Sequence, residues 1–217
     1  MNFTVIDLEK WERTEIFNHY IAQQTSFSMT KDIDITQLYC YLKEQKHSFY
    51  LGFIYLVTTI ANQDTHFKMS FNSKGQVGYW ETLSPMYTIF DKKTGLFSAL
   101  ATEYLPEFNV FKANYLSDLA TFSNSGKLFP QKVLPENVLN ISMIPWTSFT
   151  GFNLNVGNNE PYLLPIITGG KFTFLDNKVL LPVSLQVHHA VCDGFHAANF
   201  FNTFEKMAAN PQKYFEC

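Results

Sequence analysis

The 217-residue sequence is short of cysteine and long apolar runs, and each shortage excludes a class of protein. Its cysteines, Cys40, Cys192 and Cys217, include no CxxC pair, which argues against a disulfide framework or a zinc site and for a reducing, cytoplasmic compartment. The apolar part of the one long uncharged stretch, residues 49–61, is shorter than the roughly 20 residues of a membrane span. Mixed charges in the opening MNFTVIDLEKWER argue against a secretory signal.

Positive charge is scarce as well, with 16 Lys and Arg against 19 Asp and Glu and a net charge of −3. No basic stripe is present, so we expect neither nucleic acid nor a membrane as a partner. Aromatic residues are abundant instead, with 22 Phe and 11 Tyr, which indicates a globular protein with a large core and material for an aromatic pocket. Without internal repeats or a linker of low complexity, we expect residues 1–217 to form a single domain.

The local patterns predict a mixture of helices and strands. Apolar spacing predicts helices over residues 15–22, 35–45 (capped by Asp34), 51–62, 107–122 and 195–209. Turn residues predict two hairpins, at residues 69–79 and 87–100, and alternation predicts strands over residues 152–156 and 183–188. This mixture predicts an α+β protein with a large mixed sheet.

The segment QVHHAVCDGFH, residues 186–196, is the most informative for chemistry, because it joins an alternating strand to a helix. On strand parity, His189 shares a face with Val183 and Val187 and points into the interior or a pocket. A partly desolvated, neutral imidazole there can act as a general base near neutral pH. Asp193 follows at a tight turn and can orient this site or pair with a buried arginine.

The same residues permit three other interpretations. A metal site could use His188, His189, Asp193 and His196, although neighbouring residues of a strand face opposite ways and do not easily bind one ion. Cys192 beside two histidines could be a nucleophile, whereas a small buried cysteine is more common. Both histidines could also serve only as hydrogen-bonded core residues.

The whole pattern resembles one family. HHAVCDGFH is similar to the HHxxxDG signature of the chloramphenicol acetyltransferases, and related signatures occur in the acyltransferase core of 2-oxo acid dehydrogenases and in peptide-synthetase condensation domains. Four further segments resemble blocks of the chloramphenicol acetyltransferases, in the same order and over nearly the full chain. They are residues 11–13 with 19–20, residues 140–146, residues 152–155 and residues 165–168.

The resemblance implies a two-layer α/β sandwich of the coenzyme A-dependent acyltransferase type, assembled as a homotrimer with active sites at the subunit interfaces. It implies direct transfer of the acetyl group of acetyl-CoA to the primary (C3) hydroxyl of chloramphenicol in a ternary complex, without a metal. His189 corresponds to the general base, Ser142 to the oxyanion donor and Thr168 to a position that stabilises the same intermediate through a water. Asp193 corresponds to a structural acid whose partner is Arg13.

The resemblance also implies a set of residues that line the chloramphenicol site, for each of which an ordinary core position is the alternative. They are Tyr20, Phe27, Phe97, Phe129, Asn140, Leu154, Tyr162 and Ile166. The sequence departs from common family residues at His19, Thr25, Leu51 and Phe172, and none of these positions is among the proposed catalytic residues.

Three competing functions fit the same sequence. An acetyltransferase of the same fold could act on another hydroxyl compound, which substrate profiling would distinguish. A non-catalytic protein could bind a hydrophobic drug, and coenzyme A would then not protect it against unfolding. A free-standing acyltransferase core could act on dihydrolipoamide, although no carrier module accompanies this sequence.

Overall fold

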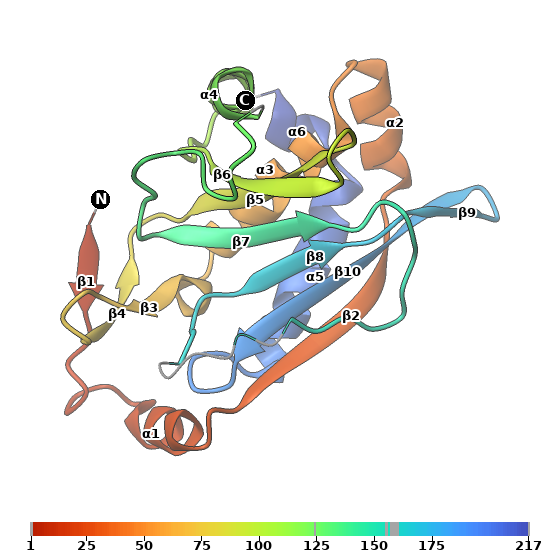
Figure 1. Ribbon diagram of the computed structural model, residues 1–217. Coiled ribbons are helices and arrows are strands. Elements are labelled where there is room, and N and C mark those ends of the chain that lie inside the picture. Colours follow the sequence, from red (N-terminus) through yellow and green to blue (C-terminus); the bar gives the residue numbers. More distant parts are fainter. Residues whose placement is uncertain (1, 124, 155, 157–160, 217) are drawn as a thin grey trace.

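A computed structural model describes residues 2–123, 125–154, 156 and 161–216. These residues form a seven-stranded mixed sheet, which dominates the fold (Figure 1). The order of its main strands is β2 (Ser26–Asp34), β10 (Lys178–His188), β8 (Ile166–Gly169), β7 (Val138–Met143), β5 (Ser84–Asp91) and β6 (Leu96–Ala101), and β9 (Thr173–Leu175) pairs with β10. Strand β10 is antiparallel to both of its long neighbours, whereas β8, β7 and β5 run parallel.

A smaller antiparallel sheet lies beside the large one, with the order β1 (Phe3–Val5), β4 (Val77–Trp80) and β3 (Met69–Phe71). Strands β3 and β4 form the first predicted hairpin, and Gly75 in its turn has a φ of 72°, which glycine adopts without strain. Strands β5 and β6 form the second. The apolar side chains of Met69 and Trp80 belong to the same buried cluster as those of the large sheet, so the two sheets share one core.

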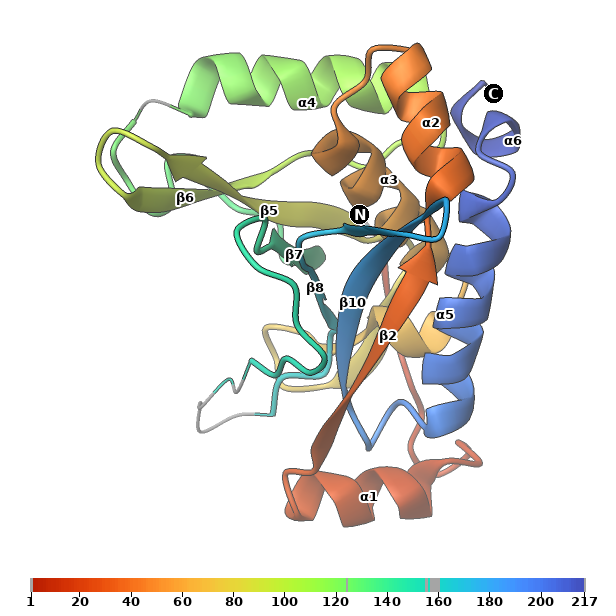
Figure 2. The same ribbon diagram turned by 90° about the vertical axis from the view of Figure 1, so that its right-hand side faces the viewer.

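Helices cover one face of the large sheet (Figure 2). Helix α3 (Phe49–Asn62) contacts β5 and β7, α5 (Gly194–Ala208) contacts β2, and α2 (Thr36–Glu44) contacts β10. At the ends of this layer lie α1 (Thr14–Ala22), α4 (Phe108–Phe122) and α6 (Gln212–Phe215). The 3-10 turn η1 (Thr65–Lys68) contacts α3 and β4. The five predicted helices therefore all form, within two residues of their expected ends, and the prediction of helices over a large mixed sheet is confirmed.

The sequence explains the central place of α3. It carries no charged residue, and 10 of its 14 residues are buried. An added Cβ at Gly52 would lie 2.5 Å from a methyl carbon of Leu42, so glycine permits the close approach of α2. Helix α2 begins at Thr36, one residue later than predicted, with Ile35 at the N-cap position, and the Asp34 carboxylate accepts a hydrogen bond from the backbone N–H of Thr36. No helix in the described part of the chain is long and apolar enough to cross a membrane.

The face of the sheet opposite the helices carries polar side chains in register. Val183, Leu185 and Val187 of β10 are buried on the helix side. Alternation therefore places Ser184, Gln186 and His188 on the other side, which we call the open face. Strand pairing aligns Ser184 with Thr168 of β8, and Thr168 with Ser142 of β7.

The predicted strand over residues 152–156 is wrong for the residues that the structure describes, because Phe152–Leu154 and Val156 form no strand and Asn155 lies outside the described residues. Between Val183 and Gln186, β10 already pairs with β2 on one side and β8 on the other, which leaves no backbone for another neighbour there. The segment crosses the open face instead and bonds to side chains. Ser184 donates to the carbonyl of Phe152 at 2.6 Å, and Gln186 accepts from the N–H of Leu154 at 2.8 Å.

Candidate active site

The turn between β10 and α5 carries His189. Because β10 ends at His188, His189 lies one residue beyond the strand, and its side chain remains 29% exposed. The imidazole stacks on the ring of Tyr20 in α1, with centroids 3.9 Å apart and an interplanar angle of 4°. Phe27 of β2 meets the same ring edge-on at 5.3 Å. The side chain of His189 is thus packed between two aromatic rings and remains partly accessible.

The two ring nitrogens of His189 have different surroundings. Nδ1 is buried and lies 3.4 Å from a carboxylate oxygen of Asp193, without hydrogen-bond geometry. Nε2 is therefore the nitrogen on the accessible side of the ring. The backbone N–H of His189 donates to the carbonyl of Thr25 at 2.8 Å, which anchors the turn to the start of β2. An ordered ring with an accessible nitrogen is what general-base chemistry requires.

Arg13 and Asp193 hold this turn in place. The guanidinium of Arg13, just before α1, donates to both carboxylate oxygens of Asp193 at 2.7 and 2.6 Å. It also donates to the carbonyls of His189 and Ala190, at 3.0 and 2.8 Å. Hydrogen bonding from Arg13 is the main cause that lowers the pKa of Asp193 below its ordinary value. The planar fork of an arginine thus fixes the backbone that presents His189.

Ser142 and Thr168 form a second group on the open face. Their hydroxyl oxygens are 2.9 Å apart and hydrogen-bonded across the parallel pair β7–β8. Thr168 is 1% exposed, so its hydroxyl is committed to this local network. A serine hydroxyl held in this way can donate to an oxyanion.

Three of the predicted pocket residues lie beside this group. Asn140 precedes Ser142 on the same face of β7, and its amide donates to the hydroxyl of Tyr162 at 2.6 Å. Burial raises the pKa of Tyr162 to about 12, so this phenol stays protonated at neutral pH. Ile166 of β8 is buried and pairs with Asn140 in the strand register.

Leu154 lies in the same region, since its backbone N–H bonds to Gln186, which pairs with Ile166, whereas Phe97 and Phe129 lie elsewhere in one chain. Phe97 lines an apolar hollow of about 460 Å³ whose other walls include Tyr50, Phe90, Met143 and Trp146. Phe129 is 49% exposed and Leu154 is 47% exposed. A single chain therefore brings together only parts of the predicted set.

His189 and Ser142 are far apart within one chain. Ser184 is aligned with Ser142 through Thr168, and His189 is five residues further along β10 than Ser184. At about 3.3 Å per residue this is about 16 Å along the strand, with two strand spacings of about 4.8 Å across the sheet. The resulting separation of roughly 19 Å exceeds the reach of two side chains toward one reacting carbon.

Two alternatives from the sequence can be compared with this geometry. Cys192 is fully buried, and burial raises the pKa of its thiol well above the ordinary value, which removes the thiolate that a nucleophile needs. Among the described residues, the histidines and carboxylates close enough to share an ion are Asp64, His66 and His196. The Nδ1 atom of His196 is already occupied, since it accepts the backbone N–H of Asp193 at 3.0 Å.

Sequence reasoning missed the walls of the apolar hollow. Trp146, Tyr50 and Phe90 come from a loop, a helix and a strand, and only the tertiary fold brings them together. The sequence carries no signal for this hollow, since the 61% exposure of Trp146, which is unusual for tryptophan, is visible only in the structure.

Comparison of the fold with solved structures identifies the structural class of the protein. A solved structure titled chloramphenicol acetyltransferase matches with a TM-score of 0.87 at 23% identity and covers 95% of this chain and 100% of its own. A dihydrolipoamide acetyltransferase from Azotobacter vinelandii matches with a TM-score of 0.67 at 18% identity, over 92% of this chain and 88% of its own. The fold is thus that of the coenzyme A-dependent acyltransferases.

Comparison of the amino-acid sequence with known proteins identifies the family to which this chain belongs. Residues 1–205 match the sequence profile of the chloramphenicol acetyltransferase family. A chloramphenicol acetyltransferase from Staphylococcus aureus is 51% identical over 99% of both chains, and one from Clostridium butyricum is 42% identical over 100% of this chain and 99% of its own. The chain belongs to the chloramphenicol acetyltransferase family and is an acyltransferase.

Proposed function

We propose that this protein transfers the acetyl group of acetyl-CoA to the primary (C3) hydroxyl of chloramphenicol and so inactivates the antibiotic. Membership of the family over nearly the whole chain supports the substrates. The observation that carries the chemistry is the ordered His189, whose Nε2 is accessible and whose turn is fixed by Arg13 and Asp193. The transfer is direct, in a ternary complex of enzyme, drug and acetyl-CoA.

His189 acts as the general base in this proposal. Its Nε2 takes the proton of the hydroxyl while the hydroxyl oxygen attacks the thioester carbonyl to form a tetrahedral intermediate. The intermediate then collapses with cleavage of the C–S bond, and the departing thiolate of coenzyme A receives the proton from His189. Ser142 donates a hydrogen bond to the oxygen that becomes negative in the tetrahedral intermediate, which is worth on the order of 3 kcal/mol of barrier. Thr168 orients Ser142 through their 2.9 Å hydrogen bond and supports the same oxygen through a water. Side chains supply every proton and charge in this scheme, so it requires no metal.

The apolar hollow lined by Tyr50, Phe97 and Trp146 suits acetyl-CoA. Met143, the residue after Ser142, lines this hollow, so the hollow adjoins the strand that carries the proposed oxyanion donor. The predicted assignment of Phe97 to the chloramphenicol site gains no support from this position. Its ring borders the hollow beside Ile89 and Phe90, on the coenzyme side of Ser142.

The separation of His189 from Ser142 supports an assembly of several copies. Since roughly 19 Å divides these residues within one chain, a complete site needs His189 of one copy and Ser142 of another. The open face, with its polar row at Ser142, Thr168 and Ser184, is the surface that a second copy would complete. We infer a homotrimer with its active sites at the subunit interfaces, the number of copies following from the resemblance to the family.

Mixed assemblies test this arrangement. His189→Ala and Ser142→Ala are each expected to be inactive alone. When equal amounts are unfolded together and reassembled at random, about a quarter of the interfaces combine both intact residues, so about a quarter of the wild-type activity should return. Failure to regain activity, with assembly shown by sedimentation, would contradict a site shared between copies.

Release of coenzyme A thiol tests the reaction itself. The purified protein is mixed with acetyl-CoA and with chloramphenicol, other hydroxyl compounds, dihydrolipoamide or no acceptor. We expect thiol release that depends on chloramphenicol. Release with another hydroxyl compound alone would favour the same-fold acetyltransferase of different specificity. No release from folded protein, together with no protection by coenzyme A against unfolding, would favour a drug-binding protein.

The organisation of the chain completes the proposal. We infer that residues 1–217 act as one domain, because a continuous buried cluster joins the small sheet, the large sheet and the helices. The free thiols of Cys40 and Cys192 are consistent with the proposed cytoplasmic location.

A further inference from the structure

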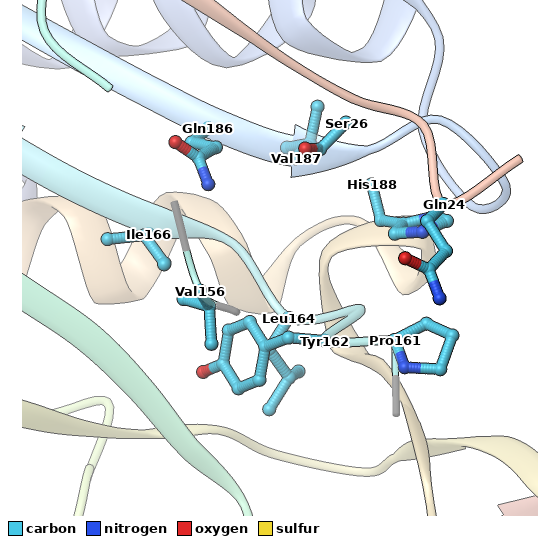
Figure 3. Close-up of a pocket in the computed structure, with 10 residues that line it drawn as sticks. All are labelled: Gln24, Ser26, Val156, Pro161, Tyr162, Leu164, Ile166, Gln186, Val187 and His188. Atoms are coloured by element: carbon cyan, nitrogen blue, oxygen red, sulfur yellow. The ribbon is translucent and has the colours of Figure 1, made fainter. Parts of the chain in front are cut away.

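A small cavity lies on the open face beside the turn that carries His189. Figure 3 shows side chains from three segments converging on it, and those used here are Gln24, Ser26, Tyr162, Ile166, Gln186 and His188. Its volume of about 100 Å³ accepts a small polar group or a few waters but not a whole drug molecule. The cavity lies on the open face, the surface that a second copy would complete in the proposed assembly, so a group bound in it would lie at the proposed interface between copies.

His188 presents an unused hydrogen-bond donor there. Its side chain is 5% exposed, and its Nδ1 accepts the backbone N–H of Ala190 at 3.2 Å. A neutral imidazole whose Nδ1 accepts must carry its proton on Nε2. Burial is the main cause that lowers the pKa of His188, which keeps the ring neutral at pH 7. The Nε2 atom is buried without a partner, and a buried donor in this state costs folding free energy until an acceptor arrives.

The neighbouring groups do not supply that acceptor. Gln186 uses its amide on the backbone of Leu154, and Tyr162 accepts from Asn140. Figure 3 places the hydroxyl of Tyr162 on the side of its ring away from His188. Besides the apolar side chain of Ile166, the cavity is therefore lined by the polar side chains of Gln24 and Ser26 and by one buried N–H without a partner.

We infer that His188 is a specificity-determining residue for the acyl acceptor, whose Nε2–H donates a hydrogen bond to a neutral oxygen of that molecule. The inference rests on the proposed function. A neutral donor on a neutral ring suits a hydroxyl or carbonyl oxygen, and chloramphenicol carries a secondary hydroxyl and an amide carbonyl close to its primary hydroxyl. Two histidines then divide the work at the interface: His189 of one copy removes the proton, and His188 on the open face of the next copy holds the molecule that loses it.

Two substitutions separate this role from a structural one. In His188→Asn the amide oxygen stands in place of Nδ1 and can still accept from Ala190, but nothing reaches the place of Nε2. In His188→Gln the longer amide can place an N–H near the position of Nε2. We expect His188→Asn to raise the KM for chloramphenicol on the order of tenfold, the worth of one neutral hydrogen bond, without changing the KM for acetyl-CoA. His188→Gln should recover part of this loss.

The control is His47→Asn, at the other end of the helix layer beside Lys112, which should leave both KM values unchanged. Thermal midpoints of all variants are measured in parallel. An unchanged KM for chloramphenicol in His188→Asn, as expected if the cavity holds only water, would overturn the inference. Equal losses of kcat and thermal midpoint in the Asn and Gln variants would also overturn it, in favour of a structural role. Absence of drug-dependent thiol release in the wild type would instead refute the proposed function, and the inference would fall with it.

Discussion

Removal of Asp193 tests the link between fold and site. In Asp193→Ala, Arg13 loses two charge-assisted hydrogen bonds at 2.6 and 2.7 Å, while its bonds to the carbonyls of His189 and Ala190 can survive. The side chain of Arg13 is only 11% exposed, so its charge remains largely buried without a counter-ion. The turn that carries His189 would keep its two backbone hydrogen bonds to Arg13 but lose the carboxylate that neutralises the charge of Arg13.

The magnitude follows from the burial of the pair. Breaking a fully buried ion pair costs about 3–5 kcal/mol of unfolding free energy. The side chain of Asp193 is 36% exposed, and solvent screening reduces this to about 2–4 kcal/mol. For a chain of this length, each 1 kcal/mol shifts the thermal midpoint by roughly 2–4 °C. We therefore expect Asp193→Ala to unfold roughly 5–15 °C below the wild type and to have reduced turnover.

Differential scanning fluorimetry at one protein concentration measures the midpoint, and thiol release measured well below that midpoint gives turnover. Asp7→Ala is the matched control, because Asp7 pairs with Lys10 at 2.9 Å but their side chains are 53% and 83% exposed. Its midpoint should stay close to that of the wild type, since exposed pairs contribute little. Asp193→Ala with an unchanged midpoint and lost activity would refute the structural role assigned to the pair.

Further predictions concern pH, the oxyanion and assembly. Because Arg13 lowers the pKa of Asp193, the stabilisation by the pair is complete above the ordinary carboxyl pKa of about 3.9 and is lost as pH falls through the lower, folded value. The difference in thermal midpoint between wild type and Asp193→Asn should therefore be constant from pH 5 to 8 and shrink below pH 4; a difference that grows on acidification would contradict this. Ser142→Ala should lower kcat about 10²–10³-fold with little change in KM, whereas Ser70→Ala on the small sheet should not change kcat, and equal effects would argue against an oxyanion donor. Sedimentation of the wild type should give the mass of three 25.0 kDa chains, and a stable monomer that is active would contradict the shared site.

Much of the fold can be read from local sequence, because the strongest patterns coincide with the main elements. The uncharged run of α3 predicts a buried helix, and Asp34 marks the start of α2 through a hydrogen bond that the structure contains. Alternation at residues 152–156 misleads, because it looks the same whether a segment pairs with a strand or bonds to side chains on a sheet face. Whether residues 152–156 can pair as a strand depends on whether both sides of β10 are already paired. They are paired with β2 and β8, which are distant in sequence from this segment.

Less of the candidate active site than of the fold could be predicted from the sequence. The motif around His189 draws attention to a base, and family resemblance supplies Ser142, but their separation depends on the register of β7, β8 and β10. No spacing in the sequence indicates that these residues cannot meet within one chain. The unpaired Nε2 of His188 is equally hidden, since it follows from the hydrogen bond between its other nitrogen and Ala190.

The most direct test of the central claim compares His189→Ala with Cys192→Ala in the thiol-release assay with chloramphenicol. Both residues lie in the same turn, so the pair controls for disturbance of that turn. We predict that His189→Ala lowers turnover about 10²–10⁴-fold while remaining folded, the usual contribution of a general base, and that Cys192→Ala stays within a few-fold of the wild type. Near-normal turnover in folded His189→Ala, or loss of turnover in folded Cys192→Ala, would contradict the assignment of His189 as the base.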